Sequence, residues 1–381
     1  MQKITKFIAD ETGGISFKTN KYSLDKSSKS IIDYEEAYKI TPSRHGETVR
    51  HAETVDLSTV AEKLQKNPSL FKYFLDGSRR TYRVDDIIYG QKVFPIVAGQ
   101  IGVGCCCRNN RRLKCQILEM HNVIVLPGTA DKDGVSPENF FGRLKDLLCS
   151  IELLKKRKVD ISKVLFYSET LKDNENYEDK GIAKVQDTMI EKEKFIVAEL
   201  AKSNLLDDNA YLLKDGSLEY KKMSSGDYKE LIKIKNNYRF CIGVSKTFNP
   251  EKIKDTRNRS NASQIAKLGL YHRTPAYFYE SEITGGVPFV VWYVRVRSVK
   301  HTYSPFEGVL KLEKILITDN EQKNGLDSEL VNYITAHIIN ERNPTCYGSD
   351  SRWANHLYPI YLTECFIKSK YLSNEYFLNL F

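Results

Sequence analysis

The stretch from residue 71 to residue 127 constrains the fold of this chain most, because its pattern is that of long strands around a polar turn. Apolar and β-branched residues fill Val93–Arg108 and Leu113–Leu126, and the charged turn Asn109–Arg112 separates the two runs. This pattern predicts a hairpin and a mostly antiparallel start to a sheet. The preceding run begins at Phe71 and closes with Asp76-Gly77-Ser78, which indicates a strand that ends in a turn.

Helices and strands alternate after this hairpin. Ser136-Pro137 predicts a helix start, and apolar residues recur at helical spacing between Glu138 and Lys158. A short strand at Val164–Tyr167, a helix from about 181 to 203 and a strand ending at Asp215 follow. This alternation predicts an α/β fold. Further strands are expected at 238–246, 276–279, 288–299 and 308–317, and closing helices near 326–342 and 359–371.

Composition indicates a soluble globular protein with one elaborated domain. The chain has 381 residues, of which 41% are hydrophobic and 28% charged. No apolar run approaches the roughly 18 residues of a membrane span, and the N-terminus lacks the apolar core of a signal peptide, so we expect a cytoplasmic protein. The eight cysteines show no paired spacing, which argues against a zinc cluster or a disulfide framework. The net charge of +9 is compatible with a polyanionic partner but does not require one.

A second apolar run closes with the same three residues as the first. Tyr211 begins it, and Asp215-Gly216-Ser217 ends it. Most Asp-Gly-Ser sequences are simple turns. Two acids at the ends of neighbouring strands, however, supply the oxygen ligands that Mg²⁺ and Mn²⁺ prefer, and two such ions can assist phosphodiester hydrolysis.

A third carboxylate is expected for such a site, and the helix before Asp215 offers three candidates. Glu193 lies at the edge of the apolar face, where a side chain could reach the sheet, whereas Glu191 and Glu199 point elsewhere. A solvated surface of alternating glutamate and lysine would give the same spacing, so both interpretations stay open.

Several short motifs, in a specific order, resemble those of the NurA family of nucleases. The first is Leu75–Arg80, followed by Met189 with Glu193 on a helix, Leu212–Leu218 and Ile242–Lys246. Arg273–Phe278, Trp292–Val296 and Tyr358–Leu362 then follow in family order. The resemblance spans about residues 71 to 371.

The resemblance implies a fold and a function. It implies an RNase H-like α/β fold with a mixed sheet flanked by helices and a β-rich elaboration, and residues 71–381 would form the nuclease domain. For residues 1–70 the residue pattern itself predicts an N-terminal arm with a helix at 57–66, and we expect this arm to serve in dimerisation or partner docking. The implied activity is an Mn²⁺- or Mg²⁺-dependent DNA nuclease with a two-metal site, exonuclease or endonuclease. The implied partners are DNA, a second copy of the chain and a hexameric HerA-type ATPase, in DNA repair or antiviral defence.

The resemblance also assigns residues. Asp76 and Asp215 match the metal-binding aspartates, Glu193 matches the helical glutamate with Glu191 as its rival, and Lys246 matches a lysine that could contact a phosphate. The histidine expected in the final helix falls on Cys365 or Phe366, so either His356 replaces it from the preceding loop or the group is absent.

The residues predicted to line the nucleic-acid path are mostly arginines, because the guanidinium fork suits phosphate. They are Arg79, Arg80, His272, Arg273 and Arg295.

Two departures from the family pattern support a competing hypothesis. Lys214 stands before Asp215, where the family usually has an apolar residue, and the final-helix histidine is missing. A catalytically weak or inactive NurA-like subunit that binds DNA and regulates the ATPase would also explain both departures.

Overall fold

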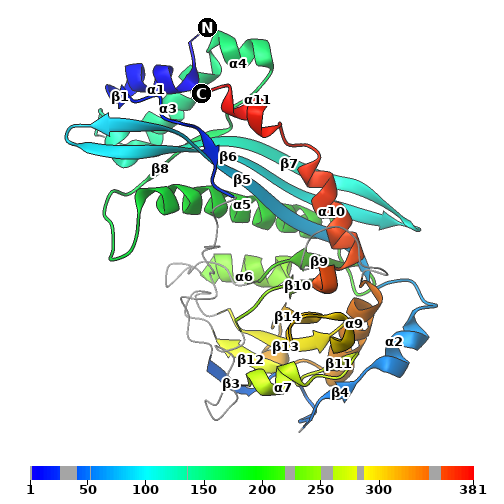
Figure 1. Cartoon of the computed structure of the whole chain (residues 1–381). Helices are drawn as coiled ribbons and strands as arrows, with labels where there is room; N and C mark the ends of the chain where they lie inside the picture. Colours follow the sequence, from blue (N-terminus) through cyan, green and yellow to red (C-terminus); the bar gives the residue numbers. More distant parts are fainter. Residues whose placement is uncertain are drawn as a thin grey trace.

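A large mixed β-sheet runs through the molecule (Figure 1). This computed structural model describes residues 2–25, 41–51, 53–134, 136–218, 228–249, 261–280, 287–342 and 353–381. The main strand order is β3-β12-β13-β14-β10-β9-β5-β6-β7-β8. Helices cover both faces of the sheet, so the predicted α/β class with a mixed, helix-flanked sheet is confirmed.

The sheet combines a long antiparallel meander with parallel pairings at its centre. β5, β6 and β7 pair antiparallel in sequence, whereas β9 pairs parallel with both β5 and β10. The longer strands are β5 (Phe71–Tyr89), β6 (Lys92–Asn109), β7 (Arg112–Pro127), β8 (Lys163–Tyr167), β9 (Tyr211–Asp215), β10 (Cys241–Ser245), β12 (Tyr277–Glu280), β13 (Phe289–Arg295) and β14 (Val309–Ile315). The shorter ones are β1 (Ile15–Ser16), β2 (Tyr22–Ser23), β3 (Thr41–His45), β4 (Val55–Asp56) and β11 (His272–Arg273).

Two helices pack on opposite faces of the meander where glycines leave room. These helices are α5 (Tyr177–Lys202) and α10 (Tyr358–Lys368). A side chain at Gly99 would meet Val185 of α5, whereas one at Gly104 would meet Ile367 of α10. Because side chains alternate along a strand, odd and even positions of β6 face different helices. This separation defines an α5 face and an α10 face.

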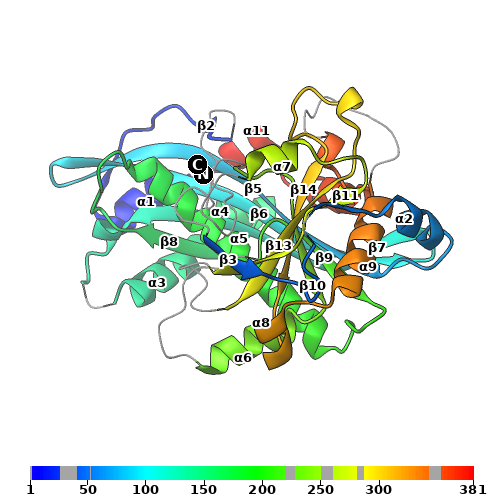
Figure 2. The same cartoon turned by 90° about the horizontal axis from the view of Figure 1, so that it is seen from below.

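The remaining helices complete the layers. α2 (Ser58–Leu64) packs against α9 (Ser328–Asn340), and the two lie side by side in Figure 2. The others are α1 (Ile4–Thr12), α3 (Pro137–Cys149), α4 (Glu152–Arg157), α6 (Tyr228–Asn237), α7 (Ala262–Ala266), α8 (Asp319–Asn324) and α11 (Asn374–Leu378). Among the helices that the structure describes, none has the length and apolarity needed to cross a membrane.

The turn predicted at Asp76-Gly77 is wrong, whereas the one at Asp215-Gly216 is confirmed. β5 continues past Gly77, which pairs with Val103 of β6, because β6 offers partners on both sides of this step. β9 ends at Asp215, and Gly216 takes a φ of +86°, a conformation that favours glycine. The same dipeptide therefore has two structures, and the neighbouring strand decides between them.

The described part of the N-terminal segment contributes four short strands that pair with strands of the sheet. β1 and β2 pair with β5, β3 pairs with β12, and β4 pairs with β11. Ile4 and Ile8 of α1 are fully buried. The expected helix at 57–66 is confirmed as α2, and a role of this segment in dimerisation or docking stays a prediction.

Candidate active site

The sheet brings Asp76 and Asp215 side by side on its α10 face. β5 and β9 pair in parallel with Leu75 opposite Lys214, so the next residues, the two aspartates, are also neighbours. Asp76 pairs with Gly104, whose missing side chain is the one that faces Ile367 of α10. Asp76 is only 4% exposed. We call Asp76, Asp215 and the groups around them the acidic corner.

Lys246, the residue after β10, supplies a positive charge to this corner. Its Nζ atom lies 2.9 Å from Asp215 Oδ2 and 3.8 Å from Glu364 Oε2. Glu364 comes from α10 and also pairs with Lys368 at 2.6 Å. Burial lowers the pKa of Lys246, but the surrounding carboxylates outweigh burial and the net shift of that pKa is upward. Lys246 is therefore held as a cation among the acids.

Asp76 is the acid of the corner whose ionisation is made unfavourable by its surroundings. Burial, the Asp215 carboxylate and more distant acids raise the pKa of Asp76 well above its usual value, although Lys246 opposes this shift. Its Oδ2 atom is buried and has no hydrogen-bond partner among the described residues. A buried carboxylate oxygen without a donor is a position where a cation would be favourable.

The donor chemistry of the corner fits a hard divalent cation. Asp76, Asp215 and Glu364 offer carboxylate oxygens, which Mg²⁺ and Mn²⁺ prefer. Within the described ranges, however, no three acidic, histidine or cysteine side chains already converge as a metal cage. In this arrangement the Lys246 ammonium group partly neutralises the carboxylates that would otherwise bind a metal ion.

Glu193 approaches the corner from the other side of the sheet. A side chain at Gly77 would overlap with Glu193 Oε1, so Glu193 packs directly beneath the step after Asp76 on the α5 face. Its Oε2 atom lies 2.9 Å from Lys214 Nζ, and both side chains are buried. Burial lowers the pKa of Lys214, but Glu193, together with Cys241 and Asp215, outweighs burial, and the net shift of that pKa is upward. The structure thus brings Glu193 to Lys214, not directly to Asp76.

Lys214 also fixes the turn that follows Asp215. Its ammonium donates to the carbonyl oxygens of Asp215 at 3.0 Å and Ser217 at 3.3 Å. The Ser217 hydroxyl donates to Glu313 at 2.8 Å, and Glu313 pairs with Lys311 at 2.9 Å. These buried charges form a chain behind the acidic corner, and they hold the backbone of Asp215 in place.

The two rival glutamates on α5 lie away from the site. The side chain of Glu191 is 64% exposed and pairs with Lys163 at 3.4 Å. Glu199 is 40% exposed and lies 4.0 Å from Lys202. Of the three candidates on this helix, Glu193 alone is buried.

Glu364 was not predicted from the sequence. The family resemblance places a histidine one or two positions later in the final helix, at Cys365 or Phe366, or replaces it with His356 from the preceding loop. The structure buries His356 at the start of α10, stacked on Tyr361 at 5.4 Å. The available signal was an acid two turns into an apolar helix with Lys368 one turn later.

Comparison with known protein families identifies the family of this chain. The NurA domain model matches residues 11–363, which is most of the chain. The chain belongs to the NurA family. The crystal structure of the NurA nuclease from Sulfolobus solfataricus is similar, with 10% identity, a TM-score of 0.40, and coverage of 82% of this chain and 86% of that chain. No curated protein matches the chain. The resemblance predicted from the short motifs is thereby confirmed.

Two of the predicted nucleic-acid contacts of this NurA-family chain are inside the protein. Arg273 is fully buried, and its guanidinium group forms two hydrogen bonds to Glu47, at 3.0 and 2.8 Å. Arg295 is 1% exposed and donates to the backbone carbonyls of Leu268, Glu307, Ala266 and Pro305. The prediction needs correcting here: both arginines hold the fold, and the structure offers neither to DNA.

The other predicted contacts are partly accessible. Arg79 donates to Gln186 of α5 at 2.7 Å, and Arg80 lies 4.9 Å over the ring of Tyr371, beyond α10. The two neighbours therefore point to opposite faces of β5, and only Arg80 shares the face of Asp76. His272 is half-buried beside Asp56, at 3.8 Å.

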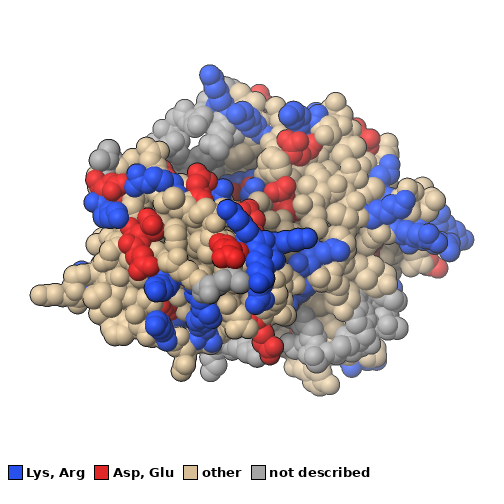
Figure 3. Space-filling view, turned by 90° about the horizontal axis from the view of Figure 1, so that it is seen from above, with Lys and Arg blue, Asp and Glu red and all other residues tan. Residues whose placement is uncertain are grey.

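On the face that Figure 3 shows, positive charge is interleaved with negative charge. Figure 3 shows, on one face, clusters of lysine and arginine interleaved with aspartate and glutamate. The net charge of +9 therefore does not by itself mark a path for DNA on this face.

Proposed function

We propose that this protein is a metal-dependent nuclease that hydrolyses phosphodiester bonds in DNA. The observation that carries the proposal is the pair formed by the buried Asp76 and the half-buried Asp215 on neighbouring strands, with Lys246 and Glu364 beside it. Membership of the NurA family supports a nuclease role.

The residues of the corner have distinct proposed roles. Asp76, Asp215 and Glu364 would hold Mn²⁺ or Mg²⁺, which would supply Lewis-acid stabilisation of the charge that develops on the phosphodiester. Lys246 can turn from Asp215 to a phosphate oxygen. The raised pKa of Asp76 keeps a proton on its carboxyl group at a pH where an exposed aspartate has lost it, so binding of a cation would release that proton.

Glu193 is proposed to act from behind the corner. Through Lys214 it positions the Asp215 carbonyl, and so it influences the site without facing Asp76 on the same side of the sheet. Glu364, rather than His356, is proposed as the functional group of the final helix.

The partners follow from the family. We propose that the protein acts as a homodimer with a HerA-type DNA-translocating ATPase, in DNA end processing or in defence against foreign DNA. The N-terminal segment, with β1 and β2 at the edge of the long meander, is the proposed docking region.

Incubation with linear DNA tests the activity. Purified protein, single- and double-stranded DNA, and Mn²⁺ or EDTA are combined, beside Asp76→Ala and the matched control Glu191→Ala, which removes an exposed acid. We expect cleavage with Mn²⁺ by the wild type and the control only. Absence of cleavage with Mn²⁺, also when the ATPase is present, or full cleavage by Asp76→Ala, would refute the assignment.

A second candidate function is a DNA-binding subunit without nuclease activity. The observation that favours it is the Lys214–Glu193 ion pair, which engages the carboxylate expected to complete the metal site. This alternative predicts DNA binding in EDTA, no cleavage under any metal condition, and no binding of Mn²⁺ by calorimetry.

A further inference from the structure

A second cationic site lies apart from the acidic corner. A cavity of about 400 Å³ opens beside the end of β13 and the end of α9. Its lining residues are Gln65, Leu270, Tyr271, Val296, Arg297, Ser298, His301, Asn340 and Arg342. The lining includes two arginines and a histidine, and none of the nine residues is acidic. A cavity with this lining attracts anions.

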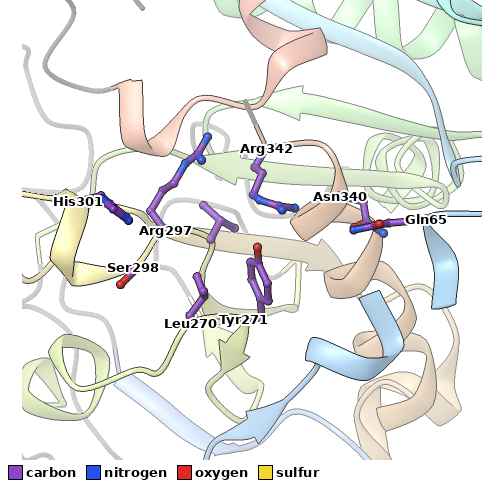
Figure 4. Close-up of a pocket in the computed structure, with 9 residues that line it drawn as sticks. Gln65, Leu270, Tyr271, Arg297, Ser298, His301, Asn340 and Arg342 are labelled. Atoms are coloured by element: carbon purple, nitrogen blue, oxygen red, sulfur yellow. The ribbon is translucent and has the colours of Figure 1, made fainter. Parts of the chain in front are cut away.

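The two arginines are held in place by aromatic rings. The Arg297 guanidinium lies 5.3 Å from the centre of the Trp353 ring, and that of Arg342 lies 5.0 Å from the centre of the Tyr271 ring. Arg342 also donates to the Ile339 carbonyl at 2.7 Å. Figure 4 shows that the two arginines line the cavity from different elements and that their guanidinium groups point in different directions. Side chains fixed in this way lose little conformational entropy when a ligand binds.

The side chain of Asn355 links the cavity to the acidic corner through hydrogen bonds to backbone groups on both sides. The side-chain amide of Asn355 donates to the Lys246 carbonyl at 2.7 Å and accepts from Gly308 N at 2.7 Å. The Gly308 carbonyl in turn accepts from Val296 N at 2.7 Å, on the cavity wall. Lys246 and the cavity therefore share one framework at the same edge of the sheet.

The segment before α10 makes a second connection. Arg342 forms a β-bridge with Leu357, the residue before the helix that carries Glu364. Backbone pairing therefore ties Arg342 to the segment that leads into the helix of Glu364.

We propose that the Arg297–Arg342 cavity binds a phosphate of the same DNA strand whose scissile phosphodiester lies at the acidic corner. The inference rests on the proposed nuclease function. The guanidinium forks match phosphate oxygens, and the Tyr271 ring with Leu270 and Val296 offers an apolar wall for the attached sugar and base. The site would hold the strand in register with Asp76 and Asp215.

Binding of a labelled single-stranded oligonucleotide in EDTA tests this site without cleavage. Fluorescence anisotropy is measured over a range of salt concentrations for the wild type, Arg297→Gln and Arg342→Gln. We expect each variant to bind about tenfold more weakly and to lose about 0.7 from the slope of log K against log salt concentration. Arg297→Lys keeps the charge, so we expect it to keep the slope.

The control removes an equal charge elsewhere. Arg143 on α3 pairs with Asp133 and is 61% exposed, and we expect Arg143→Gln to bind as the wild type does. Circular dichroism confirms that each variant is folded, and if Arg342→Gln is not folded, the comparison of Arg297→Gln with Arg297→Lys tests the site. Unchanged binding of both glutamine variants would overturn the inference, as would equal weakening by Arg143→Gln.

Competition separates a strand from a free anion. Inorganic phosphate and a mononucleotide are titrated against the oligonucleotide. If they bind in an Arg297-dependent way while oligonucleotide affinity does not depend on Arg297, the cavity is a small-anion site and the inference fails. If no metal condition gives cleavage but oligonucleotide binding depends on both arginines, the nuclease proposal fails and the DNA site stands.

Discussion

Replacement of Lys214 with methionine tests the ion pair behind the acidic corner. The Lys214 and Glu193 side chains are 5% and 7% exposed and lie 2.9 Å apart, so the variant leaves a buried carboxylate without its cation. Loss of one partner of such a pair costs about 3–5 kcal/mol. It also removes the donor to the Asp215 carbonyl. We expect Lys214→Met to lower the free energy of unfolding by this amount.

The double variant Lys214→Met/Glu193→Gln isolates the cause. It removes both charges, and an uncharged buried pair is close to neutral in stability. We therefore expect the double variant to recover most of the loss and to show a coupling energy of about 2 kcal/mol or more.

Urea denaturation followed by circular dichroism measures these differences as shifts of the midpoint at constant m-value. The control is Lys202→Met on α5, the helix that carries Glu193, because that lysine is 79% exposed. We expect the control to change stability by less than about 0.5 kcal/mol. A Lys214→Met variant as stable as the wild type, or a double variant no better than the single one, would refute the reasoning.

Three further predictions concern the corner and its metal. Gly77→Ala places a methyl group against Glu193 Oε1 and should lower the unfolding free energy by about 1–3 kcal/mol in urea, whereas Gly142→Ala, with open space in α3, should not be destabilising. The pKa of Asp76 is raised in the fold, so wild-type stability in EDTA falls as pH rises through that pKa. Thermal scans should therefore find Asp76→Asn more stable than the wild type above that pKa and equally stable at acidic pH, and the reverse order would contradict the burial of Asp76. Glu364→Gln should weaken Mn²⁺ binding by on the order of tenfold or more in calorimetry, and unchanged affinity would exclude Glu364 as a ligand.

Local pattern was enough to predict most of the strands and helices. The runs expected at 93–108 and 113–126 became β6 and β7, and the strand that ends at Asp215 became β9. The end of β5 could not be predicted, because the Asp76-Gly77 turn signal is local and the pairing with β6 that overrides it is not. The helix expected between Glu138 and Lys158 is likewise divided into α3 and α4.

The site was predictable only where it depends on a repeated local motif. Asp76 and Asp215 were named from two similar motifs, and the structure places them together. Glu364 depends on where the last helix crosses the sheet, which no local pattern determines. Arg273 is a residue type that often contacts DNA. Its partner Glu47, however, lies 226 residues away in the sequence, so its burial depends on tertiary packing that no local pattern predicts.

Alternation along β9 gives the two faces of the sheet different charges. Lys214 points to the α5 face and neutralises Glu193, while Asp215 points to the α10 face beside Asp76 and Glu364. In the part of the chain that the structure describes, these three acids gather around the Lys246 ammonium. One divalent cation would bind at this group of acids, whereas a second would need Glu193, which Lys214 already engages. We therefore expect calorimetry to find one tightly bound Mn²⁺ per chain, rather than the two expected from the sequence, and a stoichiometry of two would show that Lys214 releases Glu193.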